Sequence, residues 1–461
     1  MFSITRQRGA LLGIVLGVAA VPTLGAQQPV GRAPAPATLV TFDQALKLAL
    51  VQNTGVKQAQ NTAALSSASV TQSKLAFLPN LNVTANTAQD YGRNFSTTDG
   101  QIFNTTTNTL NAGISSSVTL FDGMKSVANL RSAQANEDAG EQDLSRAKQT
   151  AVFTVASNFL ALVTQQQQLD VQQQNLTAQE ALESQISQFV KAGSRPISDL
   201  YQQQATVASA RASVVTTQNA VELAKVDLIQ TLQLDPRGSY QFQPPALADT
   251  AAVNAKFNLD SLLDRAFAQR PDLGADASRV QAAQQDVKAA SASRWPTISL
   301  TGGYNSGVSS AADASFLNQL DQRRGGSIGV GISIPIFDRG ATQAASERAQ
   351  ISEDNAKLAL STQRQQVALE VRRAYLDYDA ATQQLAAADA QQKAASLAVS
   401  TTLQRYQVGA ATLVEVTQAR ATQVQAQSAY ITAKNNLVFQ QSLMSYYTGE
   451  LDPSTVLSGR G

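Results

Sequence analysis

The hydrophobic positions of the chain follow a seven-residue spacing in its second half. One row of mostly small apolar side chains consists of Leu360, Val367, Ala374, Ala381, Ala388 and Ala395. A second row, four positions further on, consists of Val371, Tyr378, Leu385, Gln392, Val399 and Tyr406. Two rows at this spacing are typical of a coiled coil, and the alanines let a partner helix approach closely. The pattern therefore predicts long paired helices and argues against a disordered chain.

Two very long helices are expected, each beginning at an aspartate and ending at a glycine. The second covers residues 338–409, and the first covers 122–193, with apolar residues at the same spacing at Val155, Leu162, Leu169 and Leu176. An aspartate suits a helix N-terminus because its charge complements the helix dipole. At ~1.5 Å per residue, about 70 residues span roughly 100 Å. A shorter helix is expected after each, at 196–234 and 412–447.

A helix is also expected before each alternating segment described next. A Thr-x-x-Gln capping box opens the first of these helices, at 41–77. Asn258 is a favourable N-cap for the second, which runs to about Arg294. Pro271 interrupts the second helix early, so we expect a break or kink near Arg270.

Between these helices the hydrophobic period changes to two. Apolar or small residues at Leu110, Ala112, Ile114, Ser116, Val118 and Leu120 alternate with polar residues and glycine. The same alternation returns at Ile328, Val330, Ile332, Ile334 and Ile336. Partner strands are expected at 81–85 and 298–304, with polar loops at 96–109 and 308–326. Each region is therefore predicted to form a β-hairpin with one apolar and one polar face.

The landmarks of the first half return in the second half at a constant offset. Two motifs reappear 216 positions later, Phe121-Asp122-Gly123 as Phe337-Asp338-Arg339 and Ala192-Gly193 as Val408-Gly409. Unrelated sequence of similar composition does not keep such a register, so we infer a tandem duplication. In each repeat the two shorter helices match the long helix in length. We expect them to stack end to end beside it, with the hairpins at one end and the glycine turns at the other.

The N-terminal residues match a secretory signal peptide. Arg6 and Arg8 precede an apolar run at 10–21, and small residues follow as far as Ala26. The apolar run is shorter than the ~20 residues that a membrane-spanning helix requires. The chain is divided as follows: signal peptide 1–26, N-terminal linker 27–40, repeat 1 at 41–234, equatorial linker 235–257, repeat 2 at 258–448 and C-terminal tail 449–461.

Composition excludes several classes of function. The chain has no cysteine, no histidine and a net charge of +1. A disulfide framework, a thiolate metal site and histidine-based catalysis are therefore excluded, and nothing favours a nucleic-acid partner. We expect no enzymatic activity, no cofactor and no metal site.

The length of the strands favours a membrane. About 10–12 alternating residues match the ~9–11 that cross a bilayer as a tilted strand. Open sheet edges are not tolerated in lipid, and closed bacterial barrels begin at about 8 strands, so four strands per chain require association. A soluble sheet that caps a coiled coil is one alternative. Another is a trimeric coiled-coil surface or structural protein anchored in the outer membrane, although it does not explain hairpins in mid-chain.

The order of these motifs resembles the TolC-like outer membrane efflux protein family over essentially all of 40–450. The resemblance rests on Leu-Pro-Asn-Leu at 78–81, Phe-Asp-Gly at 121–123 and a Gly-x-x-x-x-x-Asp turn at 193–199. It implies a mainly α fold with a transmembrane β portion. Homotrimerisation would complete one outer-membrane β-barrel in contact with lipid, and a long α-helical coiled-coil barrel would continue it across the periplasm.

The resemblance also implies a function and partners. It implies the exit duct of a tripartite efflux or type I secretion system. Substrates would arrive from an inner-membrane pump of the RND, ABC or a similar class, through a periplasmic adaptor protein. The duct would be closed by a periplasmic gate at the helical tip.

Residues at the positions of the family's constriction are Asp199, Tyr406, Glu415 and Gln418, with Arg195 at the first-repeat counterpart of a basic position. Ala411 and Gln418 depart from the pattern, because the family's best-known member has a basic and an acidic residue there. We therefore expect the ion pairs of the gate to be weaker or to join different residues. The turns expected to dock the adaptor contain Gly193, Ser194, Gly409 and Ala410.

Overall fold

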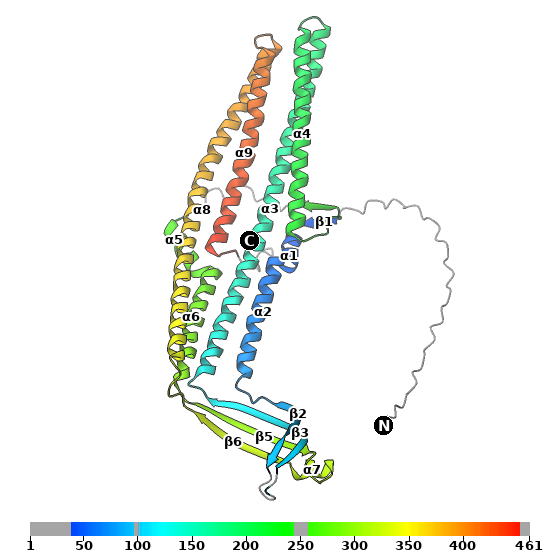
Figure 1. Ribbon diagram of the computed structural model, residues 1–461. Coiled ribbons are helices and arrows are strands. Elements are labelled where there is room, and N and C mark those ends of the chain that lie inside the picture. The colour runs from blue at the N-terminus through cyan, green and yellow to red at the C-terminus, as the bar shows by residue number, and fades with distance from the viewer. Residues whose placement is uncertain (1–37, 96–99, 101, 244–256, 452–461) are drawn as a thin grey trace, which may run out of the picture.

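The computed structural model describes residues 38–95, 100, 102–243 and 257–451. The expected signal peptide, most of the N-terminal linker and nearly all of the C-terminal tail lie outside these residues. A four-stranded sheet lies at one end of the molecule, and long helices extend from it to two turns at the opposite end (Figure 1). This placement of hairpins and turns confirms the expected arrangement.

The same order of helices occurs in both halves of the chain. Repeat 1 contains α1 (Phe42–Gln52), α2 (Thr54–Leu75), α3 (Lys125–Lys191) and α4 (Ile197–Thr231). Repeat 2 contains α5 (Leu259–Gln269), α6 (Pro271–Ser291), α8 (Ala341–Gln407) and α9 (Leu413–Thr448). The two long helices, α3 and α8, have 67 residues each, as the heptad spacing predicts. In the described part of the chain, no helix has the length and apolar character needed to cross a membrane.

The helix ends show where local sequence was decisive. The capping box forms: Thr41 Oγ1 accepts a hydrogen bond from Gln44 N at 3.3 Å, and Gln44 Oε1 accepts one from Thr41 N at 3.1 Å. Pro271 is the first residue of α6, which confirms the expected break after Arg270. The expectation of one continuous helix at 41–77 is wrong, however. Asn53 separates α1 from α2, because its side chain accepts hydrogen bonds from two backbone N–H groups and caps α2.

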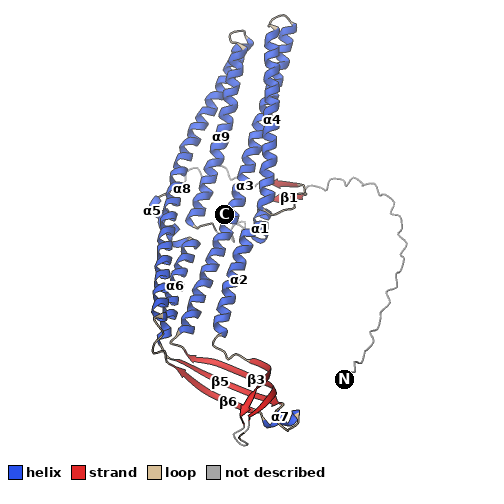
Figure 2. Ribbon diagram, in the orientation of Figure 1, coloured by secondary structure: helices blue, strands red, loops and turns tan. Residues whose placement is uncertain are grey.

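The shorter helices stack end to end beside the long ones (Figure 2). Leu46 of α1, Phe159 of α3 and Leu228 of α4 are all buried in one cluster, where the ends of α1 and α4 meet at the middle of α3. An equivalent cluster in repeat 2 joins α5, α6, α8 and α9. The predicted heptad rows of α8 face these partners, with buried residues Val367, Val371, Ala374, Tyr378, Ala381, Ala388, Ala395, Val399 and Tyr406.

The sheet consists of β2 (Asn82–Phe95), β3 (Ile102–Phe121), β5 (Thr297–Ser309) and β6 (Gly325–Ser333), all antiparallel in that order. Because strand side chains alternate between faces, the register separates them by polarity. Two cross-strand rows on one face are Val83–Ile114–Tyr304 and Val118–Leu300–Val330. Rows on the other face include Asn86–Asn111–Gly307 and Thr119–Ser299–Gly331. The expected two-faced hairpins are therefore confirmed.

Several boundaries of the predicted sheet are wrong. The strands expected at 81–85 and 298–304 are longer, because β2 covers 82–95 and β5 covers 297–309. The loop expected at 96–109 is shorter, because residues 102–109 belong to β3 and pair with β2. Their threonines are polar yet favour extended backbone. The loop expected at 308–326 contains a short helix, α7 (Phe316–Gln322). β6 ends at Ser333, so Ile334 and Ile336 lie outside it, next to Pro335, which cannot donate to a ladder.

Two short strands lie in segments expected to be linkers. β1 (Thr38–Thr41) pairs in parallel with β4 (Tyr240–Gln243) beside the middle of the helices (Figure 2). Val40 and Phe242 are buried in the same cluster as Phe159. The segment before repeat 1 and the segment after it are thereby joined to the core of repeat 1.

A buried ionic cluster holds the break between α5 and α6. The Arg270 side chain is 2% exposed, and it donates hydrogen bonds to Asp272 Oδ1 at 3.0 Å and to Glu370 Oε2 at 2.6 Å. Burial alone raises the pKa of the Asp272 carboxyl, but the hydrogen bonds and charge of Arg270 outweigh it and leave that pKa below its ordinary value. Arg146 of α3 extends the cluster by donating to Tyr446 O at 3.1 Å. The cluster thus joins α3, α6 and α8 to one another at the end of α9.

Candidate functional site

The two turns at the helical tip have the same backbone geometry. Gly193 and Gly409 adopt positive φ angles of 72° and 78°. Ser194 N donates to Phe189 O at 2.9 Å, and Ala410 N donates to Arg405 O at 2.8 Å. This is a Schellman arrangement, in which a glycine supplies the left-handed residue that ends the helix. All four residues expected to dock an adaptor, Gly193, Ser194, Gly409 and Ala410, are exposed at these turns.

Tyr406 is the buried centre of the tip. Its side chain is 0% exposed, and it lies in a cluster with apolar residues of α3 and α9: Leu182, Ile186, Leu413 and Val416. Ala411 is buried in the same cluster. The residue that departs from the family pattern therefore contributes to apolar packing. The cluster joins the helical pair of repeat 1 to that of repeat 2.

Arg195 connects the turn of repeat 1 to Tyr406. Its Nη2 donates a hydrogen bond to Tyr406 O at 3.1 Å, and its guanidinium carbon lies 4.5 Å from the centre of the Tyr406 ring. Burial raises the pKa of the Tyr406 hydroxyl, the charge of Arg195 opposes this rise, and the charge of Asp199 adds to it. Arg195, Asp199 and Tyr406, three of the five predicted gate residues, are thus brought together from two repeats.

Glu415 has a structural contact of its own in the first turn of α9. Glu415 N donates to Thr412 Oγ1 at 3.3 Å, and Glu415 Oε1 accepts from Thr412 N at 3.2 Å, which completes a capping box. Hydrogen bonds from Thr412, and then the charge of Arg405, lower the pKa of the Glu415 carboxyl. The side chain of Gln418 is exposed one turn further along α9.

Arg405 is a tip residue that sequence reasoning missed. Its Nη2 donates to Ala410 O at 2.9 Å, and its Nη1 lies 3.7 Å from Glu415 Oε2. Both side chains are about half exposed, so solvent screens this ion pair. The signal was present in the sequence, because a basic residue in the last turn of a helix favourably binds its terminal carbonyls.

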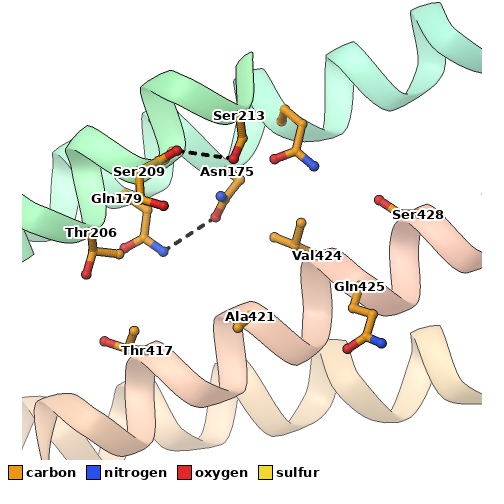
Figure 3. Close-up of a pocket in the computed structure, with 12 residues that line it drawn as sticks. Asn175, Gln179, Thr206, Ser209, Ser213, Thr417, Ala421, Val424, Gln425 and Ser428 are labelled. Atoms are coloured by element: carbon orange, nitrogen blue, oxygen red, sulfur yellow. Dashed lines mark hydrogen bonds between the residues drawn. The ribbon is translucent and has the colours of Figure 1, made fainter. Parts of the chain in front are cut away.

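A polar cleft lies below the tip, between the two helical pairs. Its volume is about 370 Å³, and side chains of α3, α4 and α9 line it (Figure 3). Amides and hydroxyls dominate its lining, including Asn175, Gln179, Ser209 and Thr417. The helical pairs meet again beyond it, where Gln168 Nε2 donates to Ser428 O at 2.9 Å. The Tyr406 cluster is therefore separated by this cleft from the next contact between the pairs.

Comparison with known proteins gives matches over most of the chain. A family model described as "Outer membrane efflux protein" matches residues 45–232 and 262–448, which correspond to the two repeats. The pyoverdine export outer membrane protein OpmQ of Pseudomonas aeruginosa is 26% identical over 392 residues, covering 82% of this chain and 76% of that protein. The outer membrane efflux protein BepC of Brucella suis is 23% identical over 346 residues, covering 74% and 72%.

A solved structure has the same fold. The outer membrane protein VceC from Vibrio cholerae matches with a TM-score of 0.76, and the match covers 88% of this chain and 96% of that one. The two sequences are 16% identical. The helical pairs, the sheet and their order are therefore shared, while the side chains at the tip have to be interpreted from this chain alone.

Proposed function

Because the chain belongs to the outer membrane efflux protein family, we propose that it is the outer-membrane exit duct of a tripartite efflux or type I secretion system. The family consists of outer-membrane channels and not of enzymes. The observation that carries the proposal is the sheet, which has an apolar and a polar face and stands at the end of long helical pairs. Such a sheet suits a wall with lipid on one side and water on the other.

The free surfaces of the chain support a closed ring of identical chains. Inside the chain, α3 packs against α6 and α9 of the other repeat. In the two repeats α8 corresponds to α3, α2 to α6 and α4 to α9. The equivalent surfaces therefore belong to α8, α2 and α4. These surfaces carry exposed apolar residues, namely Ile351, Leu358, Leu369 and Leu376 on α8, Leu65 on α2, and Val215, Leu223 and Val226 on α4.

Packing α8 of one chain against α2 and α4 of the next is a head-to-tail contact, which forms a ring when the rotation between neighbouring chains closes. The sheet also has two unpaired edges, at β2 and β6, and lipid does not tolerate open edges. A homotrimer satisfies both requirements by joining three copies of the four-stranded sheet into one barrel. This assembly is the one that the family resemblance implies.

Leu376→Asp is expected to convert the trimer into folded monomers. The Leu376 side chain is 56% exposed in the single chain, and a charge there would be buried without a partner in the proposed ring. Size-exclusion chromatography with light scattering in detergent measures the change in mass. Ser352→Asp is the control, because Ser352 is exposed on a different side of α8. A trimer that survives Leu376→Asp unchanged contradicts the ring.

We place the closed end of the duct at the helical tip. Support comes from the proximity of Arg195, Asp199 and Tyr406 and from the polar cleft behind them. Around a three-fold axis, the exposed Gln418 and the carboxylates of Asp199 and Glu415 would form rings, and rings of carboxylates favour cations.

The two exposed turns are proposed to dock the hairpin of a periplasmic adaptor, which connects the duct to an inner-membrane pump. Ser194→Cys is expected to crosslink to cysteines on the adaptor hairpin in cells with a working pump. The chain contains no cysteine of its own, so no other thiol of this protein can react. Ser352→Cys, near the sheet end of α8, is the matched control and is expected to give no product. If no position of either turn gives a crosslink, the docking proposal is contradicted.

Planar lipid bilayers test the function itself. The purified full-length protein is expected to insert and to give discrete conductance steps of uniform size. A coiled-coil surface protein that is merely anchored in the outer membrane gives no such steps. Inserted protein without steps would therefore favour that alternative and reject the duct.

A further inference from the structure

The short helix α7 covers part of the apolar face of the sheet. Ser306, Val308 and Leu110 all lie on that face, since they share it with Leu300 and Ile114 in the alternating register. Ser306 Oγ donates to Leu320 O of α7 at 2.6 Å, and Val308 is buried. α7 therefore lies on the side of the sheet that the proposed function assigns to lipid, at the end remote from the long helices (Figure 1).

Buried hydrogen bonds fix the position of α7. Gln319 Oε1 accepts a hydrogen bond from Ser309 N at 2.7 Å, and Gln319 Nε2 donates to Ala314 O at 2.7 Å. The Gln319 side chain therefore points toward the protein, whereas the other polar side chains of α7, Asn318, Asp321 and Gln322, are exposed. Two apolar side chains at the start of α7 are also largely exposed in the single chain, Phe316 at 55% and Leu317 at 74%. α7 thus presents a large apolar surface at the sheet face.

An open cavity of about 270 Å³ lies between α7 and the sheet. Its floor is a cross-strand row, Thr87–Leu110–Val308, and Phe316 forms one of its walls. The cavity is continuous with the apolar face, because the same row continues the Val83–Ile114–Tyr304 face toward the far end of the strands. It suits a hydrocarbon chain that lies along the sheet.

Two positive charges follow directly after this helix. Arg323 is the C-cap of α7, one turn beyond the anchoring Gln319, and Arg324 is the next residue. Both side chains are exposed. Arg324 forms an ion pair with Asp321 at 3.0 Å, in which both side chains are more than half exposed, so the pair is screened and readily exchanged. Exposed guanidinium groups directly after the helix that borders this partly apolar cavity match a ligand with an anionic head and a hydrocarbon tail.

We propose that α7 and the adjoining sheet face bind a phosphate-bearing lipid of the outer leaflet, with an acyl chain beside Phe316 and the phosphate on Arg323 and Arg324. The inference rests on the proposed function, which places this sheet face in lipid. Continuity of the cavity with the apolar face selects a membrane lipid over a soluble anion. α7 thereby anchors the far rim of the sheet in the headgroup region.

Native mass spectrometry of the full-length protein tests the site, with bisphosphorylated lipid A as the probe in detergent. Arg323→Gln/Arg324→Gln is expected to weaken lipid binding at least about 5-fold, because an arginine near a phosphate surface contributes about that factor. Phe316→Ser/Leu317→Ser is expected to weaken it as well. The control Arg237→Gln/Arg364→Gln removes the same charge at exposed positions outside the sheet, and should bind as the wild type does.

Two further arms identify the ligand chemistry. Dephosphorylated lipid A is expected to bind the arginine variant and the wild type equally, and an excess of inorganic phosphate is expected to displace little lipid. Equal lipid A affinity of the variant and the wild type overturns the proposal, as does complete displacement by free phosphate. Conductance of the same samples in bilayers separates the two claims. If the arginine variant forms conducting channels and binds lipid A as the wild type does, only this lipid site is rejected. If the protein never inserts into bilayers, the proposed duct is rejected.

Discussion

Replacing Arg195 and Arg405 together by alanine is expected to raise the time-averaged conductance of single channels in planar lipid bilayers several-fold. Arg195 binds the main chain and the ring of Tyr406, and Arg405 holds the neighbouring turn through Ala410 O. A cation over an aromatic ring contributes roughly 0.5–2 kcal/mol, depending on its exposure. Loss of about 1–2 kcal/mol from the closed tip shifts the ratio of open to closed channels roughly 5- to 30-fold.

Tyr406 offers a matched pair of control variants for this experiment. Its hydroxyl oxygen is buried and has no hydrogen-bond partner among the described residues, so Tyr406→Phe keeps the ring and should leave conductance unchanged. Tyr406→Ala removes the ring that Arg195 covers and should raise conductance as the double variant does. If the arginine variant conducts like the wild type, these contacts do not close the duct.

Arg270→Ala is expected to cost about 3–5 kcal/mol of stability, since it removes the cation that both partly buried carboxylates bind most closely and leaves only Arg146, 4.0 Å from Asp272, beside them. The side chains of Asp272 and Glu370 are each less than a quarter exposed. The junction is also tightly packed, because a Cβ on Gly449 would lie 2.9 Å from Gln269 O. Loss of Arg270 should therefore loosen the α5–α6 break and the end of α9 together. The midpoint of heat-induced dissociation in detergent measures the effect, which should be a decrease of several degrees.

The control for this prediction is Arg279→Ala, in α6, the helix that begins directly after Arg270. Arg279 also pairs with two carboxylates, Asp143 and Asp276, but it is 46% exposed, and exposed pairs contribute little. Its replacement should move the midpoint by a small fraction of the Arg270 effect. Equal effects of the two variants would show that burial of the Arg270 cluster is not what stabilises this junction.

The Arg270 effect should also depend on pH. The pKa of Asp272 lies below its ordinary value in the folded protein, so its stabilisation is present above the unfolded pKa of about 3.9 and is lost as pH falls through the folded pKa. Without Arg270, most of this pH-dependent stabilisation is absent, because the hydrogen bonds and charge of Arg270 are the largest causes that lower the Asp272 pKa. The difference in stability between wild type and Arg270→Ala should therefore shrink as the pH is lowered below about 4.

The sequence predicted those parts of the fold whose signal is periodic. Heptad rows such as that of Val367 located the long helices, and the alternation around Ile114 located the sheet and its two faces. Signals carried by single polar side chains were harder to interpret. Asn53 divides a helix because its amide caps the next one, and nothing in the hydrophobic pattern marks it. The threonines before Leu110 suggest a loop by polarity, yet they form strand because β2 pairs with them.

The tip shows the same limit more sharply. The family resemblance identified Arg195, Asp199 and Tyr406, and the structure brings them together. Arg405 was missed although a basic residue in the last turn of a helix is a recognisable signal, because its partners, Ala410 O and Glu415, lie in the turn and in the next helix. The helix α7 was missed because seven residues are too few for a periodic signal, and contacts with β5 hold it in place.

The proposed duct runs without interruption from the sheet to the helical tip, and blocking the channel at the tip tests this most directly. Gln418→Cys places the only cysteine of the chain on the exposed face of α9 at the tip. In the Arg195→Ala/Arg405→Ala background, a bulky thiol-reactive polymer added on the helical side of the bilayer should sharply reduce the current. Complete labelling with unchanged current would contradict the account, because ions would then cross the membrane without passing the tip.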